Sequence, residues 1–116
     1  MNTEDILREA YAKFNGRDID GVIALMHPDV EWPNAWEGGW WKGRAAVRDY
    51  WTRQWAAIDP HVEPVRFEEP EGAETIRLVV DQTVRDLQGN VIAANRVQHV
   101  YYLEGTLIRR MEVVGE

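Results

Sequence analysis

The 116-residue sequence contains no cysteine, so it can form neither disulfide bonds nor a metal site built from thiolates. It has no apolar run long enough to cross a bilayer and no charged start followed by an apolar stretch, as a secretory signal would have. A basic patch is also missing, because Arg109 and Arg110 form a pair rather than a stripe and the net charge is −7. We therefore expect a cytoplasmic protein that binds neither nucleic acid nor membranes.

What the sequence does contain is typical of a single folded domain spanning residues 1–116. Hydrophobic residues make up 45% of the chain and charged residues 28%. Its histidines, His27, His61 and His99, fall in different predicted elements without the spacing of metal ligands. No glycine-rich phosphate loop or nucleophile elbow is present. We expect neither a metal ion nor another cofactor.

The first half of the chain is predicted to form three helices. Residues 3–14 carry apolar side chains at helical spacing, between a possible capping threonine and an Asn-Gly stop. A second, short helix is expected from Asp18 to residue 26, ending before Pro28 because proline disfavours helix in the residue ahead of it. The third helix is predicted over residues 44–58, with a short strand at residues 30–32 and a loop at residues 34–43 before it.

The second half of the chain predicts a meander of strands. Residues 62–68, 74–86, 91–104 and 107–114 are rich in β-branched and aromatic side chains and are separated by glycine-containing turns. Helices followed by strands indicate an α+β fold in which the helices pack on one face of a mostly antiparallel sheet.

The last hairpin predicts which polar side chains face inward. If residues 105–106 form a two-residue turn, His99 lies opposite Glu112 and Tyr101 lies opposite Arg110 on the same face of the sheet. Polar groups on a buried face must be paired, and these four side chains could pair with one another. A bulge next to the turn would place the strand beyond it on the opposite face.

The preceding hairpin, with a turn at residues 88–89, leads to the same face. It pairs Gln82 with Asn95 among apolar neighbours and puts Asp81 opposite Arg96 on the other face, where an ion pair suits water. The inner face therefore combines apolar residues with six polar ones. Two interpretations remain open: a polar network that only fixes the register, or the floor of a pocket whose imidazole and carboxylate move protons.

All six tryptophans lie between Trp32 and Trp55. Trp51 and Trp55 share the apolar face of the third helix and are expected in the core, beside the polar groups of Tyr50 and Gln54. The others lie in or beside the glycine-containing loop, which we interpret as a lid over the pocket. These loop tryptophans are Trp32, Trp36, Trp40 and Trp41.

Four segments of the chain resemble a known family: HPDVEW, GRAAVRDYW, DLQGNV and HVYYLEGTLIRRMEV. The layout is similar to that of the SnoaL-like (polyketide cyclase, ketosteroid isomerase-like) domains of the nuclear transport factor 2-like superfamily. The resemblance implies a cone, in which a strongly curved, mostly antiparallel sheet wraps around a pocket and three N-terminal helices close it. It also implies an apolar pocket that works without metal, and a homodimer formed through the outer sheet face.

The resemblance further implies an acid/base carboxylate on the last strand, which makes Glu112 the first catalytic candidate and His99 the second. The oxyanion donors of the isomerase, a tyrosine and a protonated aspartate, have no clear match in this sequence. Residues expected to contact a ligand are Arg110, Tyr101, Gln82, Asn95, Trp32, Trp36, Trp40, Tyr50 and Gln54.

Three functions are compatible with this sequence. The first is a cofactor-independent enzyme that isomerises, cyclises, dehydrates or adds water to a small, mostly apolar organic molecule. The second is a ligand-binding or accessory protein with the same pocket and no turnover, and the third is a dimerisation module. The predicted dimer surface is the outer sheet face, with its apolar side chains Val79, Val100, Tyr102, Leu107, Met111 and Val113.

Overall fold

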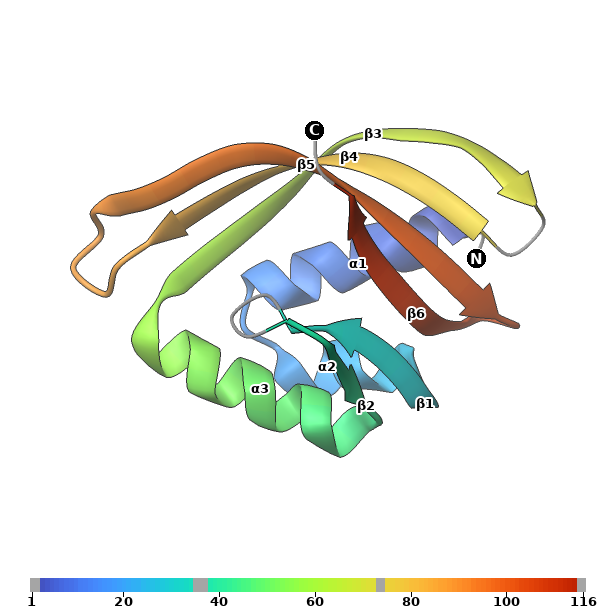
Figure 1. The fold of residues 1–116 in the computed structure, drawn as a ribbon, viewed down its shortest axis with the longest axis horizontal. Coiled ribbons are helices and arrows are strands. Elements are labelled where there is room, and N and C mark those ends of the chain that lie inside the picture. Colours follow the sequence, from blue (N-terminus) through green and yellow to red (C-terminus); the bar gives the residue numbers. More distant parts are fainter. Residues whose placement is uncertain (1–2, 35–37, 73–74, 115–116) are drawn as a thin grey trace.

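A curved, six-stranded sheet arches over three helices in the computed structural model, which describes residues 3–34, 38–72 and 75–114 (Figure 1). The strands follow the order β2-β1-β6-β5-β4-β3, and only β1 and β6 run parallel among the described pairs. The sheet curls without closing, so that it forms the wall of an open cone with the helices on its concave side. This is the predicted α+β cone.

Helix α1 (Thr3–Asn15) and helix α2 (Ile19–Ala24) form the first layer against the sheet. The buried side chains of α1 recur at steps of one, three and four residues, so they form one apolar face. Asp18 caps α2, because its carboxylate accepts a hydrogen bond from the Gly21 amide at 3.0 Å. No helix in the described part of the chain is long and apolar enough to span a membrane.

Helix α3 (Arg44–Ala57) begins after Gly43, whose φ of 88° lies in the left-handed region that favours glycine. It buries Val47, Tyr50 and Trp51 on the side that faces the sheet. The predicted extent of this helix agrees with the structure within one residue.

The segment before α3 differs from the prediction. Helix α2 ends at Ala24, and strand β1 (Met26–Pro33) already contains Pro28, which was expected to precede the strand. The pairing of β1 with β6 is irregular between Met26 and Glu31, and proline is tolerated where a sheet pairing is interrupted. Part of the expected loop forms strand β2 (Trp40–Lys42), which pairs with the end of β1.

Strands β3 (Asp59–Gly72), β4 (Thr75–Arg85), β5 (Val91–Glu104) and β6 (Leu107–Val114) form the long meander. The β4–β5 hairpin has the predicted register, with Gln82 opposite Asn95 and Asp81 opposite Arg96. Its loop is longer than two residues, but a bulge between Val84 and Arg85 restores the expected pairing. The Arg96 guanidinium donates two hydrogen bonds to the Asp81 carboxylate, at 2.7 and 3.0 Å, on the outer face.

The β5–β6 hairpin does not keep the predicted register. Glu104 pairs with Leu107 and Leu103 with Ile108 as expected, but a bulge follows immediately on β6. Beyond the bulge, Tyr102 pairs with Arg110, and every later residue of β6 faces the side opposite to the one predicted. The expected pairs His99/Glu112 and Tyr101/Arg110 are therefore wrong.

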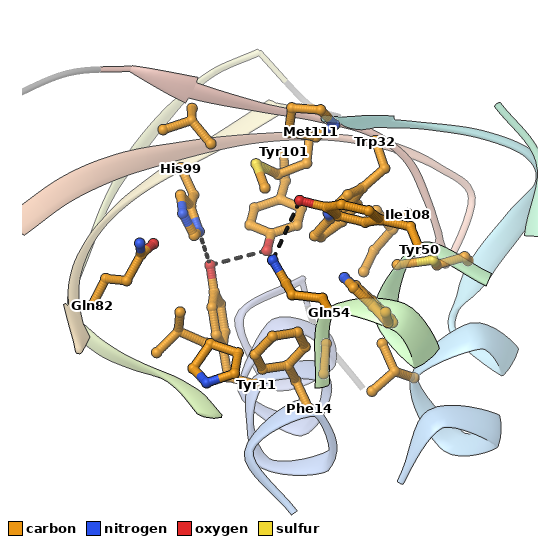
Figure 2. Close-up of a pocket in the computed structure, with 18 of the residues that line it drawn as sticks. Tyr11, Phe14, Trp32, Tyr50, Gln54, Gln82, His99, Tyr101, Ile108 and Met111 are labelled. Atoms are coloured by element: carbon orange, nitrogen blue, oxygen red, sulfur yellow. Dashed lines mark hydrogen bonds between the residues drawn. The ribbon is translucent and has the colours of Figure 1, made fainter. Parts of the chain in front are cut away.

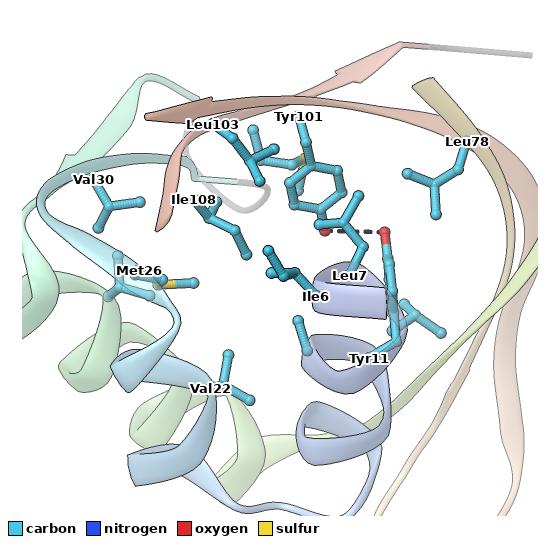
Figure 3. Packing of buried hydrophobic residues seen from close by; sticks show 14 of the residues in the cluster. Ile6, Leu7, Tyr11, Val22, Met26, Val30, Leu78, Tyr101, Leu103 and Ile108 are labelled. Atoms are coloured by element: carbon cyan, nitrogen blue, oxygen red, sulfur yellow. Dashed lines mark hydrogen bonds between the residues drawn. The ribbon is translucent and has the colours of Figure 1, made fainter. Parts of the chain in front are cut away.

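The core lies between α1, α2 and the concave face of the sheet (Figure 3). Leu7 of α1, Met26 of β1, Leu78 of β4 and Ile108 of β6 are fully buried there. Because these residues come from elements far apart in the sequence, the core fixes the helices against the sheet and thereby the shape of the space next to it.

Candidate functional site

A cavity of about 130 Å³ lies between the concave face of the sheet and the helices (Figure 2). Its wall combines aromatic and aliphatic side chains from the helices with side chains from every strand except β2. None of the described residues that line it is Asp, Glu, Lys or Arg. An engineered apolar cavity of about 150 Å³ binds benzene, so this cavity has room for a molecule with one ring.

Three polar side chains form a continuous hydrogen-bond chain along one wall (Figure 2). The Tyr101 hydroxyl donates to the Tyr11 hydroxyl at 2.9 Å, and the Tyr11 hydroxyl lies 2.6 Å from Nδ1 of His99. All three side chains are buried. Helix α1 supplies Tyr11, while His99 and Tyr101 lie two residues apart on β5 and therefore project from the same face of the sheet.

Burial keeps this chain uncharged at neutral pH. Desolvation lowers the pKa of the His99 imidazole from 6.5 to about 4, so the ring is neutral at pH 7. Burial also raises the pKa of the Tyr101 hydroxyl and that of the Tyr11 hydroxyl, the latter with a further contribution from Tyr101. The wall therefore offers neutral hydrogen-bonding groups in an apolar surrounding.

An aromatic cluster lies beside the hydrogen-bond chain, with the ring centroids of Trp32 and Tyr101 6.3 Å apart. Trp51 of α3 packs edge-to-face against Phe14, with ring centroids 5.2 Å apart, and against Trp32, at 5.3 Å. The Trp55 ring stacks on Trp51, with ring centroids 5.7 Å apart. Flat rings in this cluster suit a flat or ring-containing ligand.

Two glutamines add polar groups to the lining. Gln54 of α3 donates a hydrogen bond from Nε2 to the Tyr50 hydroxyl at 3.3 Å, and Gln82 of β4 enters the lining from the sheet. A side-chain amide has both donors and an acceptor, so these residues can bind an oxygen or a hydroxyl of a ligand.

The bulge in β6 removes both predicted charged residues from the cavity. Met111 and Val113 line it instead, while Glu112 and Arg110 lie on the outer face. The structure thus contradicts the expected location of Glu112, the first catalytic candidate.

On the outer face, Arg110 joins a small charged cluster. Its guanidinium lies 3.4 Å from the Glu31 carboxylate and 3.5 Å from that of Glu112, and it stacks on the Trp40 ring at 4.1 Å. A hydrogen bond with Glu112 raises the pKa of the Tyr102 hydroxyl. The charged residues of β6 therefore contact their partners on the outer face, away from the cavity.

The other predicted site residues divide into two groups. Asn95 and Trp40 are exposed and do not line the cavity, and Trp36 lies outside the described residues. The residues that do come together around the cavity are His99, Tyr101, Gln82, Trp32, Tyr50 and Gln54.

Tyr11 was not predicted to be a site residue. It lies on the apolar face of α1, where the spacing of the apolar residues predicts a core side chain. Its hydroxyl became recognisable only when the fold placed it between two polar groups of β5. The available signal was that a buried tyrosine hydroxyl normally needs a hydrogen-bond partner.

In residues 3–34, 38–72 and 75–114, no group of three or more histidine, aspartate or glutamate side chains could hold a metal ion. The donors that line the cavity are phenols, amides and one imidazole, which is not a ligand set typical of a metal centre.

Solved structures with the same fold cover almost the entire chain. A nuclear transport factor 2-like protein of unknown function from Burkholderia pseudomallei K96243 is 25% identical, with 100% of this chain and 92% of that chain covered and a TM-score of 0.85. TerC co-crystallised with polyporic acid is 24% identical, with 98% and 91% covered and a TM-score of 0.84.

A third solved structure is a Mycobacterium tuberculosis protein in complex with estradiol-17beta-hemisuccinate. It is 18% identical, with 96% of this chain and 91% of that chain covered and a TM-score of 0.84. At such low identity, these last two similarities establish the fold alone. The sequence matches no curated protein.

A family model described as the SnoaL-like domain matches residues 7–111. The match includes all the residues that line the cavity except Val113. It extends over well more than half of the chain, and the cone-shaped fold agrees with it. The chain therefore belongs to the family of SnoaL-like domains.

Proposed function

We propose that this protein binds a small, mostly apolar organic molecule in the cavity between the sheet and the helices. The observation that carries the proposal is the composition of the cavity wall, which is aromatic and aliphatic with a few neutral polar groups. Ligand pockets in proteins are typically of this kind, with apolar walls for affinity and a few polar groups for orientation.

The structural neighbours support this proposal without naming the ligand. One of them was co-crystallised with polyporic acid and another is in complex with a steroid derivative, and a computationally designed protein with the same fold, at a TM-score of 0.85, is a 17-OHP binder. Each of these ligands is described for that neighbouring protein alone. What the neighbours support is that a cone of this shape can hold an organic molecule.

Acid–base turnover is the second candidate function, as a cofactor-independent isomerase, cyclase, dehydratase or hydrolase. The hydrogen-bond chain from Tyr101 through Tyr11 to His99 favours it, because such a chain can move a proton. We rank it below binding for a physical reason. Catalytic bases work best with a pKa near the operating pH, and burial lowers the pKa of His99 to about 4.

Binding of ethylbenzene, an uncharged one-ring probe, tests the proposal. Titration followed by NMR should give saturable shifts of cavity residues such as Trp51 and Met111. Val84→Phe adds a ring inside the cavity and should weaken binding by at least about 10-fold. Val91→Phe is the matched control, because Val91 is 55% exposed and lies outside the lining. Absence of saturable binding, or equal weakening in both variants, would contradict the proposal.

Homodimerisation through the outer sheet face stays a prediction, and so does the cytoplasmic location. Of the six apolar residues expected on that face, Met111 and Val113 line the cavity. Val79 and Val100 are only 4% and 6% exposed within the single chain, so they offer little surface to a partner. Sedimentation that detects only the 13.5 kDa species would contradict the dimer.

A further inference from the structure

The hydrogen-bond chain on the cavity wall constrains where its protons can lie. A tyrosine hydroxyl has a single proton to donate. With Tyr101 as the donor to the Tyr11 oxygen, the proton of Tyr11 is directed to Nδ1 of His99, 2.6 Å away. Nδ1 therefore accepts a hydrogen bond.

The direction of the chain decides where the imidazole carries its own proton. A neutral imidazole has one N–H and one acceptor nitrogen, and here Nδ1 is the acceptor. Nε2 of His99 is therefore the N–H donor. No hydrogen bond joins Nε2 to any residue in the described part of the chain, although the side chain is only 5% exposed.

In the described residues, the buried side-chain atoms without a partner are Nε1 of Trp41 and of Trp55, so Nε2 of His99 is accessible from the cavity, where a water molecule or a ligand can accept its hydrogen bond. His99 lines the cavity, so an acceptor atom of a bound molecule can take this position (Figure 2). A carbonyl oxygen suits it well, because it accepts hydrogen bonds and has no proton that needs an acceptor of its own.

The lining also disfavours an anionic ligand. Without Lys or Arg among the described lining residues, a bound carboxylate would lose its hydration and gain no opposite charge. The guanidinium of Arg110, which was expected to face the cavity, is held on the outer face by Glu31.

We propose that the cavity selects uncharged carbonyl compounds, such as ketones and esters, and that Nε2–H of His99 donates a hydrogen bond to their carbonyl oxygen. Tyr11 acts as a positioning residue, because its hydroxyl fixes the tautomer and the orientation of the imidazole ring. This inference rests on the proposed binding function and names the ligand class for the same cavity.

Three one-ring probes of similar size test the ligand class: ethylbenzene, acetophenone and benzoate. They differ in whether they carry no acceptor, a neutral carbonyl or a charged carboxylate. In the wild type, we expect benzoate to bind at least about 30-fold more weakly than acetophenone, because the cavity offers no compensating charge. Benzoate binding as tightly as acetophenone would overturn the inference.

The His99→Leu variant tests the donor, with His61→Leu as its matched control because His61 is exposed on β3. His99→Leu should lower the affinity for acetophenone relative to ethylbenzene by about 3- to 10-fold, as expected for one hydrogen bond. His61→Leu should leave this ratio unchanged. The same ratio in all three proteins would overturn the inference while ethylbenzene binding still supports the proposed function. If none of the probes binds, the proposed function itself fails and the inference fails with it.

The tautomer can be measured without any ligand. Nitrogen-15 NMR of the wild-type imidazole at pH 7 should show a protonated Nε2 and an unprotonated Nδ1. Tyr11→Phe should shift the Nδ1 resonance, because the hydrogen bond to it is lost, whereas Tyr102→Phe on the outer face should not. A protonated Nδ1 in the wild type would overturn the inference, whatever the probes do.

Discussion

The two faces of β5 carry polar groups of opposite character, although residues only a few positions apart supply them. On the inner face, His99 and Tyr101 are buried and neutral, and they join Tyr11 in one hydrogen-bond chain. On the outer face, Arg96 forms a two-point ion pair with Asp81, and both side chains are about half exposed. The fold thus separates neutral hydrogen-bond chemistry from charge across the thickness of one strand.

Tyr101 and Tyr102 illustrate this difference within a single dipeptide. The pKa of both phenols is raised, but for different reasons: burial raises that of Tyr101, and a hydrogen bond with Glu112 raises that of Tyr102. Inner polar groups depend on their protein partners because water cannot replace them. Outer polar groups keep their hydration, so the loss of one partner has a small effect.

The largest expected difference between the faces concerns two tryptophans. Trp51 is fully buried in the inner aromatic wall, whereas Trp40 is 39% exposed above Arg110 on the outer side. Trp51→Ala should lower the free energy of unfolding by about 3–5 kcal/mol, because a buried ring leaves a hole that the structure fills only partly. Trp40→Ala should change it by less than about 1 kcal/mol. Denaturant titration measures both, and equal losses would contradict the assignment of Trp51 to the inner wall.

The next effect is a dependence of stability on pH that comes from His99. The unfolded imidazole takes up a proton below pH 6.5, but the folded one does so only below about pH 4. Between these values the unfolded state binds more protons, so the stabilisation is complete above pH 6.5 and falls as the pH drops toward 4. The total loss should be about 3 kcal/mol.

Comparison with a variant isolates the contribution of His99 from that of the carboxylates. The difference in unfolding free energy between the wild type and His99→Gln should shrink as the pH falls from 6.5 to 4. The same difference for Asn95→Gln, which replaces an exposed side chain without a titrating group, should stay nearly constant. If the His99 difference were also constant, the imidazole would not be buried in its neutral form.

A smaller effect separates the two neighbouring tyrosines. Tyr101→Phe removes the donor to Tyr11 and should lower the unfolding free energy by about 1 kcal/mol. Tyr102→Phe removes a hydroxyl that water can replace and should have no measurable effect on stability. Thermal unfolding of the two variants measures both changes. A larger loss of stability in Tyr102→Phe than in Tyr101→Phe would contradict the difference between the two faces.

The sequence predicted most of the fold because its signals were local and agreed with one another. Apolar periodicity placed α1 and α3, and β-branched runs bounded by glycine turns placed β5 and β6 at their observed limits. Strand β2 was not predicted, since three residues with two tryptophans have no period to detect. Its pairing with β1 depends on contacts that the local sequence does not specify.

The site was predicted in part, and the reason lies in the two hairpins. Both contain a bulge, but in β4–β5 the bulge offsets a longer loop, so the inner position of Gln82 agreed with prediction. In β5–β6 the bulge follows a short turn and moves Arg110 and Glu112 to the outer face. Side chains alternate strictly along a strand, so a single extra residue reverses every later assignment.

The smallest expected effect is that of Glu112→Gln. Glu112 contacts Arg110 at 3.5 Å on the outer face and does not line the cavity. Loss of one partly exposed ion pair should change the unfolding free energy by less than about 1 kcal/mol. Affinity for ethylbenzene and acetophenone should stay within about 2-fold of the wild type, because the neutral cavity wall is untouched.

Met111→Gln is the matched comparison, because it places the same amide one residue earlier on β6, where the side chain lines the cavity. It should weaken ethylbenzene binding clearly, since a polar group replaces apolar wall. If Glu112→Gln weakened binding more than Met111→Gln, β6 would have the unbulged register in solution. Glu112 would then face His99, and the separation of charge from the cavity would be wrong. The pair of variants therefore tests the bulge itself, on which the neutral character of the site depends.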